Sequence, residues 1–225
     1  MTTDSRATIA LRFLADIAAH NDREWFAAHR ERYDEARAAF ESLVGELIPA
    51  VAQVEPAVAP LTVRDCTYRF YRDTRFSPDK SPYKRHFGAY LNPLGKKSPH
   101  GGYYLHFEPG HCLVAGGAYC LEPKVLRAVR ESVVDRIDEF RAIVETPAFR
   151  RRFPTLGSEW VKTVPKGFPR DFPWPDYIRC KDYSVSQSLP DAFFDRPDWM
   201  AQVVDAFACM KPFLDFVNDT VDDYL

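Results

Sequence analysis

The sequence lacks several features that define large classes of proteins. It has no run of about 20 apolar residues that would cross a membrane, and the apolar stretch at its N-terminus is interrupted by charges, unlike a signal peptide. Its five cysteines are odd in number and none forms a C-x-x-C pair. This argues against a disulfide framework and against a zinc knuckle. These absences predict a reduced, cytoplasmic protein without membrane contact.

Glycine is also scarce, with ten residues in the chain. None lies in a G-x-G-x-x-G or G-x-x-x-x-G-K-[ST] pattern, so no nucleotide-binding loop is predicted. The pairs Gly101-Gly102 and Gly116-Gly117 instead indicate β-bulges or a close approach of two strands. No Ser or Cys lies in a nucleophile elbow, which argues against acyl transfer by that arrangement.

The composition present is that of a globular protein. The 225 residues are 46% hydrophobic and 14% aromatic, enough for a full core, and we expect a single domain over residues 1–225. The formal net charge is −2, so a nucleic-acid partner is unlikely on composition.

Helical periodicity is strongest near the two ends and in the middle of the chain. Asp22 is a suitable N-cap, Pro147 should end the middle helix, and Pro212 should interrupt the last one. The predicted helices are Thr8–His20, a long helix after Asp22 to Val51 that Pro49 kinks or ends, Glu122–Ile143, and one from about Pro197.

Between these helices the period changes to that of short, aromatic-rich strands separated by turns. The predicted strands are Tyr68–Tyr71, His86–Leu91, Gly102–Glu108, Leu113–Tyr119, a short one at Tyr177–Cys180, and one near Tyr183–Gln187. The rest of Phe153–Pro190 should be a lid or a packed loop. The predicted fold class is α+β: a central antiparallel sheet of short strands covered by long N-terminal, middle and C-terminal helices.

Charge is distributed unevenly. Residues 64–97 contain nine Lys and Arg against three Asp, whereas residues 191–225 contain eight Asp against two basic residues. Such a basic segment binds an anion or is neutralised by the protein's own carboxylates, here Asp73, Asp79 or the acidic C-terminal helix. The side chains predicted to bind a ligand are Arg69, Arg72, Arg75, Lys80, Lys84 and Tyr104.

Strand alternation places candidate chemical groups on one side of the sheet. If Tyr103, Leu105 and Phe107 face the core, then Tyr104, His106 and Glu108 face the other side, where His86 and Tyr90 should join them. The candidate catalytic residues are therefore His106, Glu108 and His86, with an imidazole as general acid or base. Besides anion binding and acid/base chemistry, a third alternative is a metal bound by His106, Glu108 and either His86 or His111. Because H-x-E on a strand supplies only two ligands, no metal is predicted.

Three segments also resemble a known family. They are similar to the domain of unknown function 2461 (DUF2461) family. The central segment is RDTRFSPDKSPYKRHFGAYL with the following GGYYLHFEPG and GGAYCLEP, the early one is NDREWFAAHRERY, and the late one is PKGFPRDFPWPDYIRCKDYSV. The resemblance spans nearly the whole chain. It implies the extent of the domain and supplies no reaction or cofactor.

Two functions from different classes remain open. The first is binding of a small anionic, phosphate- or carboxylate-bearing ligand by the basic loop, residues 72–84, over the polar sheet face, with acid/base chemistry by His106 as an extension. The second is a noncatalytic interaction module whose basic hairpin docks an acidic surface or forms a homodimer. Converging cations would favour the first, and cations spread over a flat surface the second.

Overall fold

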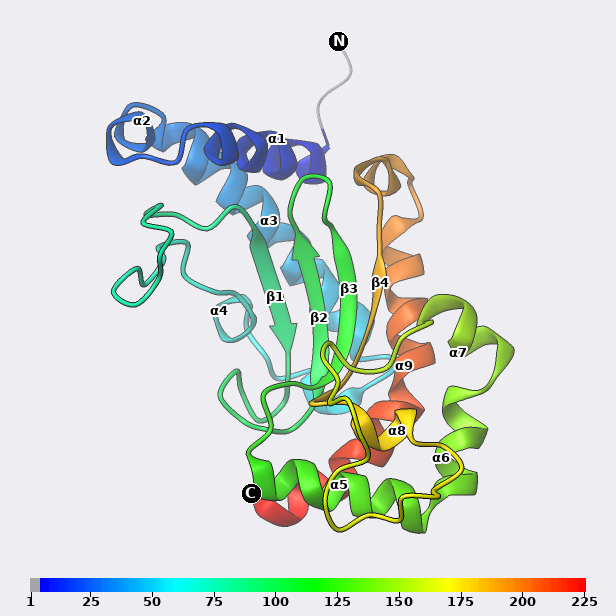
Figure 1. Ribbon diagram of the computed structural model, residues 1–225. Helices are drawn as coiled ribbons and strands as arrows, with labels where there is room; N and C mark the ends of the chain where they lie inside the picture. Colours follow the sequence, from blue (N-terminus) through cyan, green and yellow to red (C-terminus); the bar gives the residue numbers. More distant parts are fainter. Residues whose placement is uncertain (1–4) are drawn as a thin grey trace.

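The computed structural model describes residues 5–225 and has an α+β fold, which confirms the predicted class. Four strands in this range form one antiparallel sheet in the order β1-β2-β3-β4. Their bounds are β1 Phe87–Leu91, β2 Gly102–Phe107, β3 Leu113–Ala118 and β4 Tyr183–Ser188. Figure 1 shows the sheet at the centre of the molecule, with β1 and β2 uncovered by helices on the side that faces the viewer.

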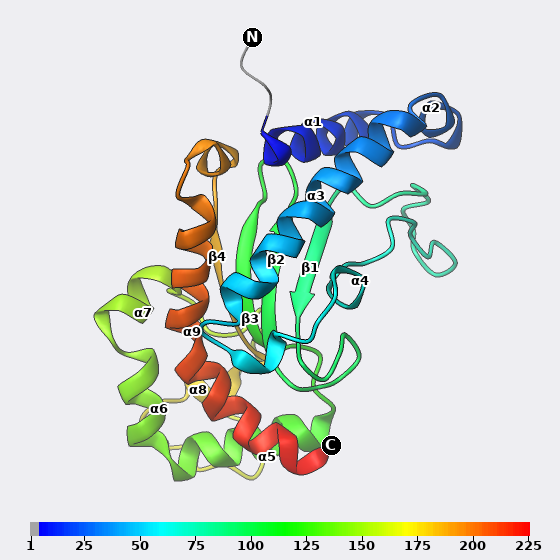
Figure 2. The ribbon, with the colours of Figure 1, turned by 180° about the vertical axis from the view of Figure 1, so that it is seen from behind.

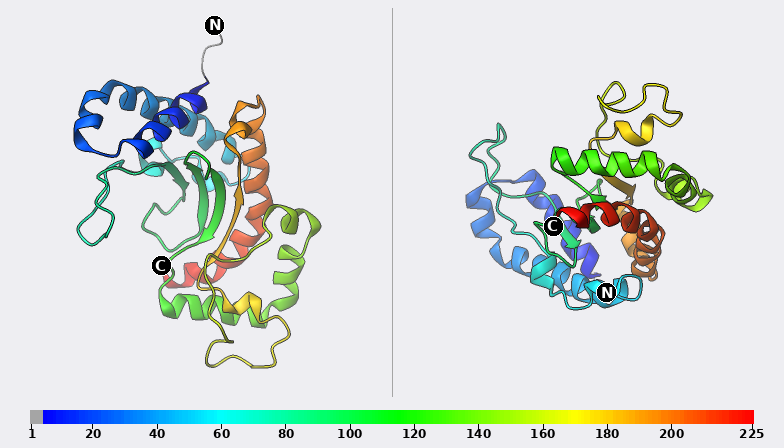
Figure 3. Two further views of the ribbon diagram at one scale, coloured as in Figure 1. Left: turned by 45° about the horizontal axis from the view of Figure 1, so that its top comes forward. Right: turned by 90° about the horizontal axis from the view of Figure 1, so that it is seen from below.

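The helices are divided between the two ends of the chain and the long connection from β3 to β4. They are α1 Arg6–Ala19, α2 Arg23–Ala28, α3 Arg30–Val51, α4 Val63–Cys66, α5 Pro123–Asp135, α6 Ile137–Val144, α7 Pro147–Arg152, α8 Asp176–Arg179 and α9 Trp199–Val221. Viewed from behind, α3 and α9 lie across the other face of the sheet (Figure 2). The two views of Figure 3 show α5, α6, α7 and α8 grouped at one side of it.

The core lies between the sheet and these covering helices, and it fixes the phase of the strands. Tyr103, Leu105 and Phe107 are buried, as are Ala89 and Leu91 on β1. Since successive side chains of a strand point to opposite faces, Tyr104 and His106 must point away from the core. The predicted phase of β2 is therefore confirmed.

Capping side chains explain where the first helices begin. The Asp22 carboxylate accepts a hydrogen bond from the Trp25 amide at 2.8 Å and begins α2, as predicted. Ser5 caps α1 in the same way. The predicted long helix is, however, divided at His29, whose backbone has φ −116° and ψ 26° and therefore leaves the helical region.

The structure corrects one prediction about proline: α9 is not interrupted at Pro212 but continues through it. α3 ends at Val51, two residues beyond Pro49, which was predicted to kink or end it. α6 ends at Val144, before Pro147 as predicted, and Pro147 then begins α7, because proline is well suited to the first turn, where its missing N–H is not needed, and Thr146 caps that turn.

Two predicted strands are absent from residues 5–225. Tyr68–Tyr71 makes one isolated bridge, from Tyr71 to Tyr83, and the residue before it, Thr67, makes another to Ala89 of β1, so no continuous ladder forms. Tyr177–Cys180 forms the end of the short helix α8, in which Pro175 supplies the first turn with a fixed φ of −60°.

The connection between α7 and β4 packs against the core. Ile178 and Cys180 are completely buried, and the buried carboxylate of Asp182 accepts hydrogen bonds from the amide of Ser158 and from the hydroxyls of Ser158 and Ser184. Residues 154–176 contain no fully buried side chain and contact the core through partly buried apolar residues such as Leu156, Val164 and Phe168, so a lid or a packed loop stays a prediction for this part of the segment.

No helix within residues 5–225 is both long enough and apolar enough to cross a bilayer.

Candidate functional site

The polar face of β1 and β2 brings together the residues predicted to carry chemistry. In the antiparallel register Gly88 lies opposite His106 and Tyr90 opposite Tyr104. Continuing that register by one residue places His86 across from Glu108. His86, Tyr104, His106 and Glu108 are each partly exposed on this face.

His106 is held on both sides by hydrogen bonds. Its Nε2 lies 3.0 Å from Oε2 of Glu108, and its Nδ1 lies 2.8 Å from the hydroxyl of Tyr104. Because an ionised carboxylate can only accept, Nε2–H donates to Glu108, and in the neutral imidazole Nδ1 then accepts the Tyr104 proton. Tyr104, His106 and Glu108 thus form a chain along one strand.

His86 packs beside His106, with the ring centroids 4.5 Å apart. Burial lowers the pKa of His86 to about 4, and the neighbouring His106 and Lys84 act in the same direction. His86 is therefore neutral at neutral pH and has a nitrogen lone pair available as a proton acceptor or a ligand.

The three side chains also satisfy the first requirement for holding a metal ion. One ligand atom from each of His86, His106 and Glu108 can be chosen so that all three lie within 4.8 Å of one another. The sequence predicted His86 on the same face as the H-x-E pair, but without the register between the two strands it gave no distance between them.

Gly88 contributes to the site by having no side chain, and the sequence prediction missed it. A Cβ at this position would lie 2.5 Å from the hydroxyl oxygen of Tyr104 and 2.9 Å from its Cε2. The ring of Tyr104 therefore crosses β1 at Gly88, which brings its hydroxyl to His106. The signal was present as a glycine at the third residue of the predicted strand His86–Leu91, where glycine often marks a close approach.

Lys84 is a cation close enough to this cluster to lower the pKa of His86. Its ammonium lies 5.2 Å from the centroid of the Tyr68 ring. Burial lowers the pKa of Lys84, and Arg69 lowers it further. Within residues 5–225 neither Lys84 nor Arg69 has a carboxylate within 4.0 Å.

The basic loop, residues 72–84, pairs its two arginines with its own carboxylates and holds Lys80 by a hydrogen bond to its backbone. Arg72 pairs with Asp79 at 2.5 Å, Arg75 pairs with Asp73 at 2.6 Å, and the Lys80 ammonium donates to the carbonyl of Thr74 at 2.9 Å. The loop extends sideways from β1 (Figure 1). The structure thus groups Lys84 with His86, His106, Glu108 and Tyr104, and leaves Arg72, Arg75 and Lys80 within the loop.

The acidic C-terminal helix does not neutralise the basic loop. Its carboxylates have other partners: Asp219 pairs with Arg136 at 2.5 Å, Asp215 with Lys211 at 2.7 Å, and Asp222 with His100 at 2.6 Å. The sequence predicted that Asp73, Asp79 or the acidic C-terminal helix would neutralise the basic segment. Within the loop, the pairing carboxylates are those of Asp73 and Asp79.

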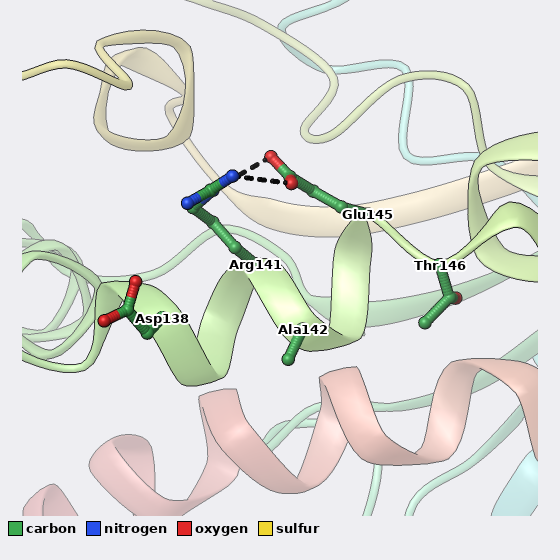
Figure 4. Close-up of a pocket in the computed structure, with 5 residues that line it drawn as sticks. All are labelled: Asp138, Arg141, Ala142, Glu145 and Thr146. Atoms are coloured by element: carbon green, nitrogen blue, oxygen red, sulfur yellow. Dashed lines mark hydrogen bonds and ion pairs between the residues drawn. The ribbon is translucent and has the colours of Figure 1, made fainter.

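A separate hollow lies on α6 and is shown in Figure 4. It has a volume of about 330 Å³ and is lined by Asp138, Arg141, Ala142, Glu145 and Thr146. Arg141 and Glu145 are joined by hydrogen bonds of 3.0 and 3.1 Å, so its central cation and carboxylate neutralise each other. None of its residues belongs to the predicted site.

Comparison with known families gives one match, to the model of the conserved hypothetical protein family DUF2461, over residues 9–216. The chain belongs to the DUF2461 family. The match covers β1 to β4 and all the site residues described above, and it confirms the resemblance found in the sequence. Neither the curated proteins nor the solved structures contain a match to this DUF2461 chain.

Proposed function

We propose that the polar face of β1 and β2 binds a small anionic ligand, phosphate- or carboxylate-bearing, with Lys84 as its principal cation. The observation that supports this proposal is the state of Lys84: a partly buried ammonium with no carboxylate partner in residues 5–225. A charge withdrawn from water without a counter-ion is unfavourable, and a bound anion removes that cost.

The neighbouring groups suit the same ligand. The Tyr104 hydroxyl and the imidazoles of His86 and His106 can donate or accept hydrogen bonds, and the exposed Arg69 adds a second cation near Lys84. Arg72, Arg75 and Lys80 have a secondary role in this proposal, since binding an anion would require them to leave partners within the loop.

Acid/base chemistry is the extension of this proposal. An imidazole held between a phenol and a carboxylate can take the proton of the phenol as the phenol oxygen takes one from a ligand, while the other ring nitrogen stays hydrogen-bonded to the carboxylate. His106 has that arrangement, with Tyr104 and Glu108 on its two sides.

The alternative function is a noncatalytic interaction module that docks a partner through the tip of the basic loop, where Phe76 is 94% exposed. Concentration-dependent sedimentation of the chain would favour this alternative.

The test compares two cations of the basic loop, Lys84 and Arg75. Protein freed of metal on a chelating resin is titrated calorimetrically with inorganic phosphate and with citrate. Lys84→Gln should weaken binding at least about tenfold, the size of one charge-assisted hydrogen bond. Arg75→Gln removes the same charge from a side chain paired with Asp73 and should leave the affinity nearly unchanged.

Two outcomes would overturn the proposal. One is the absence of binding of either anion to the unaltered chain. The other is an equal loss of affinity in Lys84→Gln and Arg75→Gln, which would show attraction to the general surface charge instead of a site.

A further inference from the structure

We propose that His86, His106 and Glu108 form a site for one divalent first-row transition metal ion, of the Fe²⁺ or Zn²⁺ class. This goes beyond anion binding and does not depend on it, since it uses the two imidazoles and the carboxylate, whereas the anion proposal rests on Lys84.

The ligand set has the composition and spacing that such ions require. Metal–ligand bonds of about 2.1 Å place two neighbouring ligand atoms of one ion roughly 3.0 to 3.4 Å apart. The distance between His106 Nε2 and Glu108 Oε2 is 3.0 Å, and a ring nitrogen of His86 completes a set within 4.8 Å. Coordination of one ion by all three groups requires the ligand atoms, now within 4.8 Å of one another, to approach to that spacing.

A second layer of contacts already orients His106. Metal-bound imidazoles commonly donate their other ring N–H to an oxygen, which fixes the ring and its tautomer. The Tyr104 hydroxyl lies 2.8 Å from Nδ1 and can accept that hydrogen bond. When a metal takes Nε2, the imidazole proton moves to Nδ1 and the hydrogen bond to Tyr104 reverses its direction, with no net loss of a proton from the ring.

Gly88 makes this second layer geometrically possible. Because any side chain at position 88 would collide with the Tyr104 ring, the glycine keeps the phenol beside His106. This arrangement is independent of the three ligands and points to the same atom, Nδ1 of His106.

Three protein ligands leave coordination positions open. Two imidazoles and one carboxylate are the ligand set of catalytic zinc sites and of non-haem iron sites, in which water or a substrate oxygen takes the remaining positions. Hard ions such as Mg²⁺ and Ca²⁺ prefer oxygen ligands and should not compete. If the anion proposal also holds, an anion held by Lys84 could supply one of the open ligands.

The test uses the full chain, stripped of metal, and Co²⁺ as a spectroscopic probe at neutral pH. We expect one equivalent to bind with a visible d–d absorption band, to be displaced by Zn²⁺, and to be unaffected by Mg²⁺ or Ca²⁺. His86→Ala, His106→Ala and Glu108→Gln should each weaken Co²⁺ binding at least about 100-fold, and Tyr104→Phe about tenfold.

His111→Ala is the matched control, because His111 is exposed in the turn between β2 and β3, outside the ligand set. Its Co²⁺ affinity should equal that of the unaltered chain. Circular dichroism and thermal melting establish that each variant folds, and Tyr104→Phe keeps the test informative if a ligand variant does not.

The metal proposal and the anion proposal fail separately. Lys84→Gln should weaken phosphate binding yet leave Co²⁺ affinity the same or tighter, since it removes a cation near the ion. Absence of stoichiometric Co²⁺ binding, or Co²⁺ binding that survives Glu108→Gln and both histidine variants, would overturn the metal site, whatever the phosphate titration shows.

Discussion

At the scale of single residues, the site depends on a side chain that is absent. The ring of Tyr104 occupies the space above Gly88, so the hydrogen bond from Tyr104 to His106 exists only while residue 88 has no Cβ. A position that looks like a minor element of a strand pattern therefore determines where the phenol lies.

Gly88→Ala should destabilise the fold by about 1 to 3 kcal/mol, the usual cost of forcing extra volume into a packed place. The added methyl would meet Tyr104 at 2.5 to 2.9 Å, so the ring must move away from His106. Urea unfolding measures the loss. Gly45→Ala is the control of opposite sign: it lies within α3, its Cβ would meet only Val63 at 3.7 Å, and it should stabilise by about 0.5 to 1 kcal/mol.

The double variant locates the cause of the loss. In a Tyr104→Ala background the ring is gone, and Gly88→Ala should cost much less than in the unaltered chain. An unchanged cost would mean that the backbone of β1, and not the phenol, excludes a side chain at this position.

At the scale of elements, the sequence prediction was wrong about Pro212, which does not interrupt α9. A proline inside a helix removes one hydrogen bond and crowds the preceding turn, but a helix held by tertiary packing can accept that cost. α9 is such a helix: Met210, Phe213 and Leu214 on either side of Pro212 are buried in the core. Figure 2 shows α9 changing direction along its length, as a proline-containing helix commonly does.

Pro212→Ala should stabilise the protein by about 1 to 2 kcal/mol, because an alanine amide can donate to the carbonyl of Ala208 while the exposed position loses no packing. Thermal unfolding of the variant beside the unaltered chain measures this. A destabilised variant would show that the proline is needed for α9 to follow the sheet.

The strands show what the sequence can and cannot predict. Alternation along Gly102–Phe107 was sufficient to assign Tyr104 and His106 to one face, because one buried face of β2 leaves a single permissible phase. The approach of His86 to Glu108 depends on the register between two strands joined by a connection of ten residues, 92–101, and local periodicity carries no information about it. Ion pairs inside the basic loop are one of the alternatives that the sequence predicts. Which cations take part in them depends on the path of the loop in space, which the sequence pattern does not determine.

At the scale of the whole molecule, several tyrosine side chains are buried with their hydroxyl groups. Burial raises the pKa of Tyr90 to about 12 and those of Tyr103 and Tyr183 further, and the Tyr103 hydroxyl has no hydrogen-bond partner in residues 5–225. The folded state therefore holds protons that the unfolded chain releases near pH 10. The stability due to these phenols is complete below pH 10 and is lost as the pH rises above it.

We expect cooperative unfolding in alkali, with phenolate absorbance and circular dichroism changing together above pH 10. Tyr103→Phe removes one of the buried phenols, whose hydroxyl has no hydrogen-bond partner. This variant should therefore unfold at higher pH and be no less stable at neutral pH. Gradual ionisation of all tyrosines before any loss of dichroism would contradict the assigned burial.

The order of the strands along the chain has a consequence for how the molecule assembles. β1, β2 and β3 follow one another closely, whereas residues 119–182 intervene before β4 pairs with β3. Contacts between near neighbours in sequence form with a small loss of chain entropy, and distant ones form later. The hairpin of β1 and β2, which carries His86, His106 and Glu108, can therefore form early in folding, before β4 and α9 complete the sheet and its cover.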